Sequence, residues 1–272
     1  IRYSDVRIEL PDGTTLQPGR LSGDLGWVCH VSDPVQLVAN IGFGFRAPNI
    51  ADLGTLGNRP GNRFNVPNAN LDAEKVMHGD FGLRHRSRHW QVELMAFALR
   101  YTDRIVSVST GGVTPGGRDI VQSVNAASSS LRGLELGARF DPSDRIGIEL
   151  LLNYARGTQR VAGFEEPADR VPPLNGRAEI QFRYSDAWLF TGWFAAAAGQ
   201  DRLSERDVRD PRIDPAGTPG WGVVGLSSVW TPGAGWYARL GVDNLLDRRY
   251  RTHGSGIDAP GRNVSLTLRR SW

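Results

Sequence analysis

The chain has 272 residues, of which 40% are hydrophobic and 22% are charged, and its formal net charge is +3. No apolar run approaches the roughly 18 residues of a transmembrane helix, and the one cysteine, Cys29, excludes a disulfide scaffold and a cysteine-rich metal site. Acidic residues are interleaved with the basic ones, so the sequence has no cationic stripe and nucleic acid is not an expected partner.

Apolar and polar residues alternate with period two along most of the chain, which is typical of half-buried β-strands. Every second residue from Leu37 to Phe45 is apolar, for example, and no stretch combines a helical period with capped ends. In chain order, the pattern predicts eleven strands at residues 20–31, 34–47, 75–86, 89–108, 119–140, 145–159, 174–185, 187–200, 219–231, 235–247 and 261–272. Residues 1–10 are a candidate for a truncated twelfth strand, because Val6, Ile8 and Leu10 alternate.

The connections between these strands alternate between short turns and long loops. The long loops are expected at residues 48–74, 109–118, 160–173, 201–218 and 248–260. Outer-membrane barrels have short turns at one rim and longer loops at the other, and a tilted strand crosses the bilayer in about 9–11 residues. The pattern therefore predicts an all-β, transmembrane antiparallel β-barrel.

The tryptophans support this prediction. Six of the eight stand where a strand meets a short turn or the chain end: Trp27, Trp90, Trp188, Trp230, Trp236 and Trp272. Amphipathic aromatic rings are favoured at the level of the lipid headgroups, where barrels carry aromatic girdles. We expect one face of each strand, including Cys29, to contact lipid and the other to line a wet lumen. A soluble β-rich module would have no reason for this placement of tryptophan.

An odd number of strands creates a closure problem. The first and last of eleven antiparallel strands would meet in parallel, and unpaired edges are costly in lipid. We therefore expect residues 1–272 to be the C-terminal part of a larger barrel, truncated at the N-terminus, with 11 or 12 of its strands.

Several short motifs occur in a fixed order along the chain. They comprise Phe45, Arg46, Ala47 and Pro48, then Asn68 and Leu71, then Gly133 and Glu135, then Asn244, Leu245, Asp247 and Tyr250, and finally the terminal Trp272. In this order and spacing, the chain resembles the C-terminal half of a TonB-dependent outer-membrane receptor. The resemblance covers about residues 36–272.

This resemblance implies about half of a 22-stranded barrel in the outer membrane of a Gram-negative bacterium. It also implies a plug domain and N-terminal barrel strands on a part of the protein outside this sequence, through which a TonB complex would act. The implied function is energised uptake of a scarce nutrient, most plainly a ferric siderophore or another metal chelate. The alternative is a passive, porin-like channel.

The expected loops offer two groups of candidate ligand-binding residues. The first group is Arg59, Asn62, Arg63 and Asn65, and the second is Tyr250 and His253. Arginine and amide groups suit an anionic, oxygen-rich ligand, although solvated loops also have this composition. No histidine stands between Pro48 and Pro67, which disfavours haem, although His78 or His253 remains available. Cobalamin and copper chelates stay open.

The sequence does not indicate an enzyme. None of the five histidines stands in a Gly-x-Ser-x-Gly or His-Glu-x-x-His motif. The sequence therefore predicts no enzyme, no catalytic residue, no metal site of its own and no cofactor. The acidic residues Glu165 and Glu166 and the charged run 201–210 are interpreted as solvated loop charge.

Overall fold

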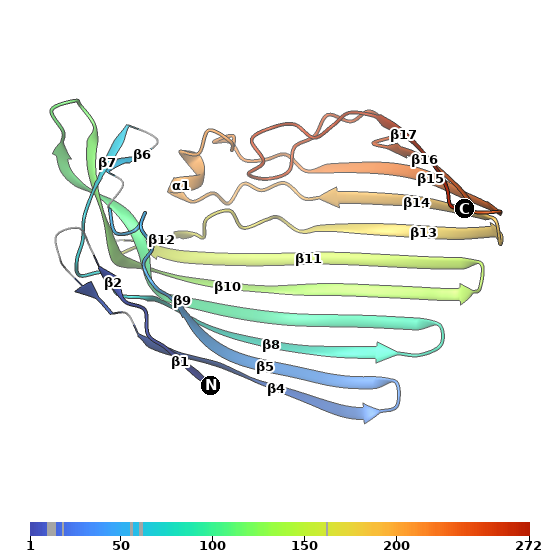
Figure 1. Cartoon of the computed structure of the whole chain (residues 1–272), viewed down its shortest axis with the longest axis horizontal. Coiled ribbons are helices and arrows are strands. Elements are labelled where there is room, and N and C mark those ends of the chain that lie inside the picture. Colours follow the sequence, from blue (N-terminus) through green and yellow to red (C-terminus); the bar gives the residue numbers. More distant parts are fainter. Residues whose placement is uncertain (10–14, 18, 55–56, 60–61, 162) are drawn as a thin grey trace.

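The computed structural model describes residues 1–9, 15–17, 19–54, 57–59, 62–161 and 163–272. In these residues the chain forms a 15-stranded sheet and a separate two-stranded one (Figure 1). The main sheet runs, in spatial order, through β1 (Arg2–Ser4), β4 (Arg20–Ser32), β5 (Val35–Arg46), β8 (Glu74–Arg86), β9 (Trp90–Val113), β10 (Asp119–Ser143), β11 (Ile146–Val161), β13 (Asn175–Ser185), β14 (Trp188–Ala197), β15 (Trp221–Gly233), β16 (Trp236–Asp243) and β17 (Asn263–Arg270).

The remaining elements lie in the long connections. They are β6 (Asn58–Arg59) and β7 (Arg63–Val66), β12 (Phe164–Pro167), the separate pair β2 (Ile8–Glu9) and β3 (Thr15–Leu16), and the single-turn helix α1 (Glu205–Val208). Within the described ranges, no helix is long and apolar enough to cross a membrane.

All eleven predicted strands are present, and the neighbours along β4 to β17 pair antiparallel. The twelfth is shorter than expected: Arg2–Ser4 pairs with β4, whereas Ile8 pairs with Leu16 in the separate β2–β3 pair. Val6 lies in no strand, and Leu10 falls outside the described residues.

The expected loop 109–118 is mostly strand. Val113 pairs with Asp119, so the β9–β10 hairpin continues to a turn at residues 114–118. The turn closes tightly because Gly117 adopts a φ of +73°, the N–H of Thr114 donates to the carbonyl of Arg118, and the N–H of Gly117 donates to the carbonyl of Thr114. The prediction of a long loop here was wrong, since the small polar residues of this segment remain compatible with a ladder.

The register separates two faces of the sheet. Leu152, Leu136, Leu94, Leu83, Leu37 and Cys29 form one row of cross-strand partners. Rows of the other parity carry charged and amide groups, as in the row of Glu149, Arg139, Gln91 and Arg86. We call these the apolar face and the polar face. They confirm the alternation expected from the sequence.

The apolar face is uncovered along the whole sheet. Leu25 is 72% exposed at one side of the sheet, Leu134 51% in the middle and Leu266 66% at the other side. Soluble monomers rarely expose a contiguous apolar patch of more than a few hundred Å². A face of this extent suits the hydrocarbon of a bilayer.

Aromatic rings gather at the end of the sheet with the short turns (the right-hand end in Figure 1). The rings of Trp90 and Phe140 stack at 4.1 Å, and Trp188 lies opposite Trp230 with ring centroids 5.8 Å apart. Arg270 lies over the ring of the terminal Trp272, 4.7 Å from its centroid. We call these rings the girdle, and they lie at the short-turn end as the sequence predicts. Trp27 is the exception, because it lies within β4 opposite Ala39 and not at the turn.

The sheet is open. In the described residues the order begins at β1 and β4 and ends at β17, and these two sides do not pair with each other. Both sides therefore present unpaired backbone groups, which lipid cannot satisfy.

Candidate ligand-binding surface

The connections opposite the short turns form the loop end of the sheet (left in Figure 1). Its described residues are 47–54, 57–59, 62–73, 114–118, 163–174, 198–220 and 244–262. Both groups of predicted ligand-binding residues lie there, and most of the motif residues hold its loops in place.

The first motif fixes the start of the loop 47–73. Arg46, the last residue of β5, pairs with Glu74 on β8 and with Asp52 in the loop, each at 2.6 Å. Asn49 and Asp52 exchange hydrogen bonds, because the backbone N–H of each donates to the side chain of the other at 3.0 and 2.9 Å. Phe45, Ala47 and Pro48 complete this segment, in which Pro48 is buried.

The end of the same loop is tied to β9 and β10. Asn125 donates from its amide to the carbonyls of Asp72 and Asp103 at 3.0 and 2.7 Å, and it accepts from the N–H of Asp72 at 2.8 Å. Asp103 stands at a bulge with a φ of +56°, and its carboxylate accepts from Lys75 at 2.7 Å. The loop is thus anchored through side chains from three strands.

The second motif covers the inside of this loop. The amide of Asn68 donates to the carbonyl of Ser123 at 2.8 Å. Leu71 packs with Leu53 in a small core, and these side chains are 4% and 1% exposed. Asn68 and Leu71 therefore support the loop, rather than face solvent.

The first group of predicted ligand-binding residues stands on β6 and β7. Arg59 and Arg63 are direct cross-strand partners, and Asn62, at a φ of +57°, is exposed beside them. Asn62 donates to the carbonyl of Gly117 at 2.9 Å, which joins this pair to the β9–β10 turn. Asn65 differs, because it is 2% exposed and its amide donates to the carbonyl of Ala51 at 3.0 Å. Asn65 lies inside the loop.

The second group belongs to a different pair of loops. The ring of Tyr250 packs against that of Trp221 at 4.6 Å, and Nδ1 of His253 lies 2.9 Å from the hydroxyl of Thr218. Burial lowers the pKa of His253 below its ordinary value, and Arg170 adds to this effect against the opposing charge of Asp207. No described contact joins Tyr250 or His253 to the first group.

The motif at 244–250 locks the β16–β17 connection. Asn244 is 4% exposed, adopts a φ of +49° and donates to the carbonyls of Arg248 and Pro260 at 2.8 and 3.1 Å. Leu245 donates from its N–H to the carbonyl of Val224 at 2.9 Å, and the carboxylate of Asp247 accepts from the N–H of Arg262 at 2.7 Å. Because of these contacts β16 ends at Asp243. The sequence predicts a strand that continues to residue 247, so this part of the prediction was wrong.

Two motif residues lie in the sheet itself. A side chain at Gly133 would place its Cβ 2.2 Å from the carbonyl oxygen of Tyr154 and 2.4 Å from the ring of Phe97. Only glycine fits at this position. Glu135 is exposed two residues further along the same strand.

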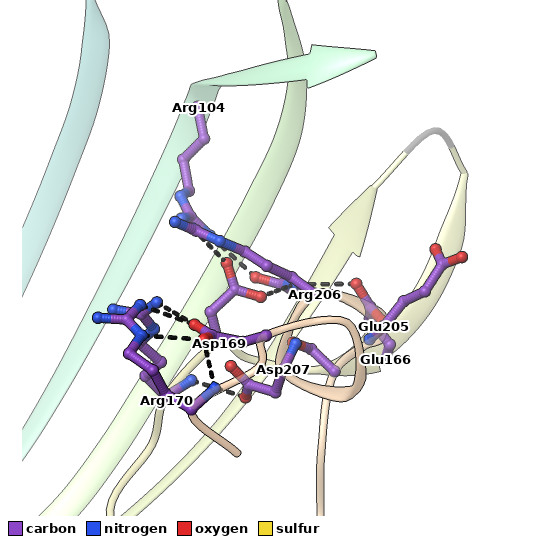
Figure 2. A network of polar contacts seen from close by, with 11 residues as sticks. Arg104, Glu166, Asp169, Arg170, Glu205, Arg206 and Asp207 are labelled. Carbon is purple, nitrogen blue, oxygen red and sulfur yellow. Dashed lines mark hydrogen bonds and ion pairs between the residues drawn. The ribbon is translucent and has the colours of Figure 1, made fainter. Parts of the chain in front are cut away.

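A polar network that the sequence did not reveal joins β9, β11, residues 163–174 and the α1 segment (Figure 2). At its centre, Gln159 is 4% exposed. It accepts from Arg104 at 3.0 Å and donates to Glu166 and Asp169 at 2.9 and 2.7 Å. Arg206 pairs with Asp169 at 3.1 Å, which brings the α1 segment onto β11.

The network corrects the interpretation of this acidic run as solvated charge. Asp207 is 1% exposed and accepts from the backbone of Arg170 at 2.9 Å. Burial opposes ionisation of Asp169, but hydrogen bonds from Ser204, Gln159 and Arg206 outweigh it and hold its pKa below the ordinary value. The capping spacing from Ser204 to Asp207, whose N–H donates to the Ser204 hydroxyl at 3.1 Å, was the available signal.

The loop end therefore offers a basic hairpin tip at Arg59 and Arg63 and a separate network of buried polar groups around Gln159. In the described residues, no group of three or more His, Cys, Asp or Glu side chains is placed to hold a metal ion. The chemistry of this surface is that of hydrogen bonding and charge.

Comparison with known proteins identifies the architecture. Residues 1–245 match the family model of the TonB dependent receptor-like β-barrel. The chain is 25% identical over 304 residues to the ferric enterobactin receptor PirA of Pseudomonas aeruginosa. This alignment covers 99% of this chain and 41% of that receptor. The chain thus spans less than half the length of this curated relative.

Solved structures show the same fold. The FrpB iron transporter from Neisseria meningitidis (F3-3 variant) superposes with a TM-score of 0.82 at 16% identity, over 98% of this chain and 41% of that one. The copper transporter OprC superposes with a TM-score of 0.78 at 22% identity, over 96% of this chain and 40% of that one. Because the family model covers most of its length, the chain belongs to the family of TonB-dependent receptor-like β-barrels.

Proposed function

We propose that the chain supplies barrel wall and ligand-binding loops to an outer-membrane receptor for a metal chelate. Family membership supports a transporter rather than an enzyme. The names of the similar proteins, a ferric enterobactin receptor, an iron transporter and a copper transporter, support metal or metal-chelate uptake. The exposed apolar face and the tryptophan girdle support a place in the membrane.

The observation that carries the choice of ligand is the β6–β7 tip. Arg59 and Arg63 lie directly opposite each other, so two guanidinium-bearing residues stand together at this tip. Guanidinium groups bind carboxylates and similar oxygen anions in a bidentate manner, so two of them side by side suit an anionic ligand. Asn62 adds an amide beside the pair. A ferric siderophore or another anionic chelate has this chemistry.

The open sheet bears on how the protein is assembled. We infer that β4 and β17 pair with further strands of the same barrel, since unpaired edges are costly in lipid. A plug domain inside that barrel and a TonB complex acting on it would then supply the energised step. The polar face of the present strands would line the path of the ligand.

A titration of purified protein in detergent tests the ligand. The probes are ferric enterobactin and copper(II) citrate, and the readout is quenching of tryptophan fluorescence. The double variant R59Q/R63Q should bind the preferred chelate at least about tenfold more weakly, because charged hydrogen bonds contribute about 1.5–3 kcal/mol each. The matched control R160Q/R209Q also removes two charges, but from exposed ion pairs with Glu165 and Glu205. Equal binding by both double variants, or no binding of either probe, would contradict the proposal.

Uptake by cells distinguishes the receptor from a passive channel. Accumulation of radiolabelled iron chelate should stop when the proton motive force is collapsed. A porin-like channel would continue to equilibrate the chelate across the outer membrane, and the family match does not favour it.

A further inference from the structure

Three arginines lie together on the apolar face near the loop end. Arg132 on β10 and Arg156 on β11 are direct cross-strand partners. Arg100 on β9 pairs with Ser130, which places it diagonally beside Arg132. All three are exposed, and they line one open cleft of about 550 Å³ together with Ile41 and Met77.

These arginines have no acidic partner. Among the described residues, the side chain of none of the three makes a hydrogen bond or an ion pair with another protein group. Further along β11 on the same face, Arg160 is already paired with Glu165 at 3.6 Å. Like charges directly opposite on a sheet repel each other, and packing of the aliphatic stems on an apolar face leaves the guanidinium charges uncompensated. The cluster is therefore built for an anion from outside the chain.

The position of the cluster along the strand identifies the kind of anion. Arg100 lies ten residues beyond Trp90 of the girdle on the same strand. At about 3.4 Å per residue this is about 34 Å along the strand, or about 26 Å across the membrane at a tilt of about 40°. The apolar band of a barrel is about 25 Å tall, so the arginines stand at the second headgroup level, on the loop side.

We propose that Arg100, Arg132 and Arg156 bind the phosphate of an anionic lipid headgroup in the leaflet on the loop side. This rests on the proposed function, because it requires the apolar face to contact lipid. Guanidinium groups bind phosphate in a bidentate manner. The hydroxyls of Ser130 and Thr158, hydrogen-bonded to each other at 3.1 Å on the same face, leave one hydroxyl proton as a further donor. Ile41 and Met77, 49% and 56% exposed, give the same cleft an apolar side beside the arginines.

Native mass spectrometry of the purified protein in dodecyl maltoside tests this proposal. The probe is lipid A, a glycolipid with two phosphates, compared with its dephosphorylated form. R132Q/R156Q should lower the apparent affinity for lipid A about tenfold or more and leave the weak binding of the dephosphorylated lipid unchanged. R160Q, a change on the same face in an existing ion pair, should remain within about twofold of wild type. Equal retention of lipid A by wild type and R132Q/R156Q would overturn the proposal.

Two further variants keep the test decisive if the double variant assembles poorly. R132K/R156K keeps both charges and should retain lipid A within about threefold, and R100Q leaves the opposed pair intact and should lose about threefold. Pyrophosphate is the probe for a free anion. If it binds to the arginine cluster as tightly as lipid A does, the site takes small phosphates and the lipid assignment is wrong.

The same variants separate this inference from the function on which it rests. R132Q/R156Q should bind ferric enterobactin as wild type does, whereas R59Q/R63Q should retain lipid A. Loss of lipid binding with intact chelate binding identifies a separate lipid site. Chelate binding without any preference for phosphorylated lipid refutes only the present inference.

Discussion

Asn244 offers a direct test of how the loop end is held together. Its side chain makes three hydrogen bonds, two to the carbonyls of Arg248 and Pro260 and one from the N–H of Arg248 at 2.9 Å. It is 4% exposed and adopts a left-handed φ of +49°. Asparagine tolerates this conformation, whereas alanine pays a penalty of roughly 1 kcal/mol.

The expected losses follow from these contacts. Three hydrogen bonds at a net value of about 0.5–1.5 kcal/mol each give a loss of about 1.5–4.5 kcal/mol in the free energy of unfolding for N244G. N244A should lose about 1 kcal/mol more, because alanine also bears the backbone strain. The difference between the two variants isolates the conformational part from the hydrogen-bonding part.

Guanidinium unfolding in detergent, followed by tryptophan fluorescence, measures these losses. Amide exchange at Arg248 adds a local readout, since its N–H donates to Asn244. Protection of this amide should fall in both variants, and the N–H of Leu245, bound to Val224, should be affected less. The reasoning is refuted if N244A lies within about 0.5 kcal/mol of wild type, or if N244G is less stable than N244A.

Three further predictions concern other parts of the structure. G133A should destabilise the sheet by about 1–3 kcal/mol in the same assay, because its Cβ would meet a backbone oxygen at 2.2 Å, whereas G116A, in open space, should change little. The lowered pKa of His253 contributes stability that is complete above about pH 6.5 and is lost as the pH falls through the folded-state pKa; H253Q should flatten the unfolding free energy between pH 7.5 and 5. Q159L should speed proteolysis at residues 162–174, because it removes the bonds to Glu166 and Asp169, and an unchanged cleavage rate would show that the network does not hold this loop.

The sequence predicts the sheet well because each strand has to satisfy two solvents. Leu134 and Glu135 are adjacent in the chain but lie on opposite faces of the sheet. Each spanning strand therefore alternates apolar and polar residues with a period of two, and this pattern is visible in the sequence. The short turns and tryptophans then fix which end of each strand is which. Strand ends were harder to predict, as at Val113 and Asp243, because small polar residues fit a ladder and a loop equally well.

The loop end was less predictable because its contacts join distant segments. Arg206 reaches Asp169 across 37 residues, and Asn125 reaches Asp72 across 53. No local pattern encodes such pairs, so a buried acid such as Asp207 resembles solvated charge in the sequence. The motif residues were recognisable, but their roles as anchors became clear only from hydrogen bonds. The ligand-binding roles of Arg59, Asn62, Arg63, Asn65, Tyr250 and His253 remain predictions.

The central claim is that the apolar face contacts lipid along its whole width. With Cys29 replaced by serine, single cysteines at positions 134, 135, 136 and 137 of β10 can each carry a spin label in protein reconstituted into vesicles. Collision rates with oxygen, which concentrates in lipid, and with a water-soluble nickel chelate then report the surroundings of each label. The account predicts high oxygen and low nickel accessibility at 134 and 136, and the reverse at 135 and 137. Equal accessibility at all four positions, or nickel access at 134 and 136, would contradict it.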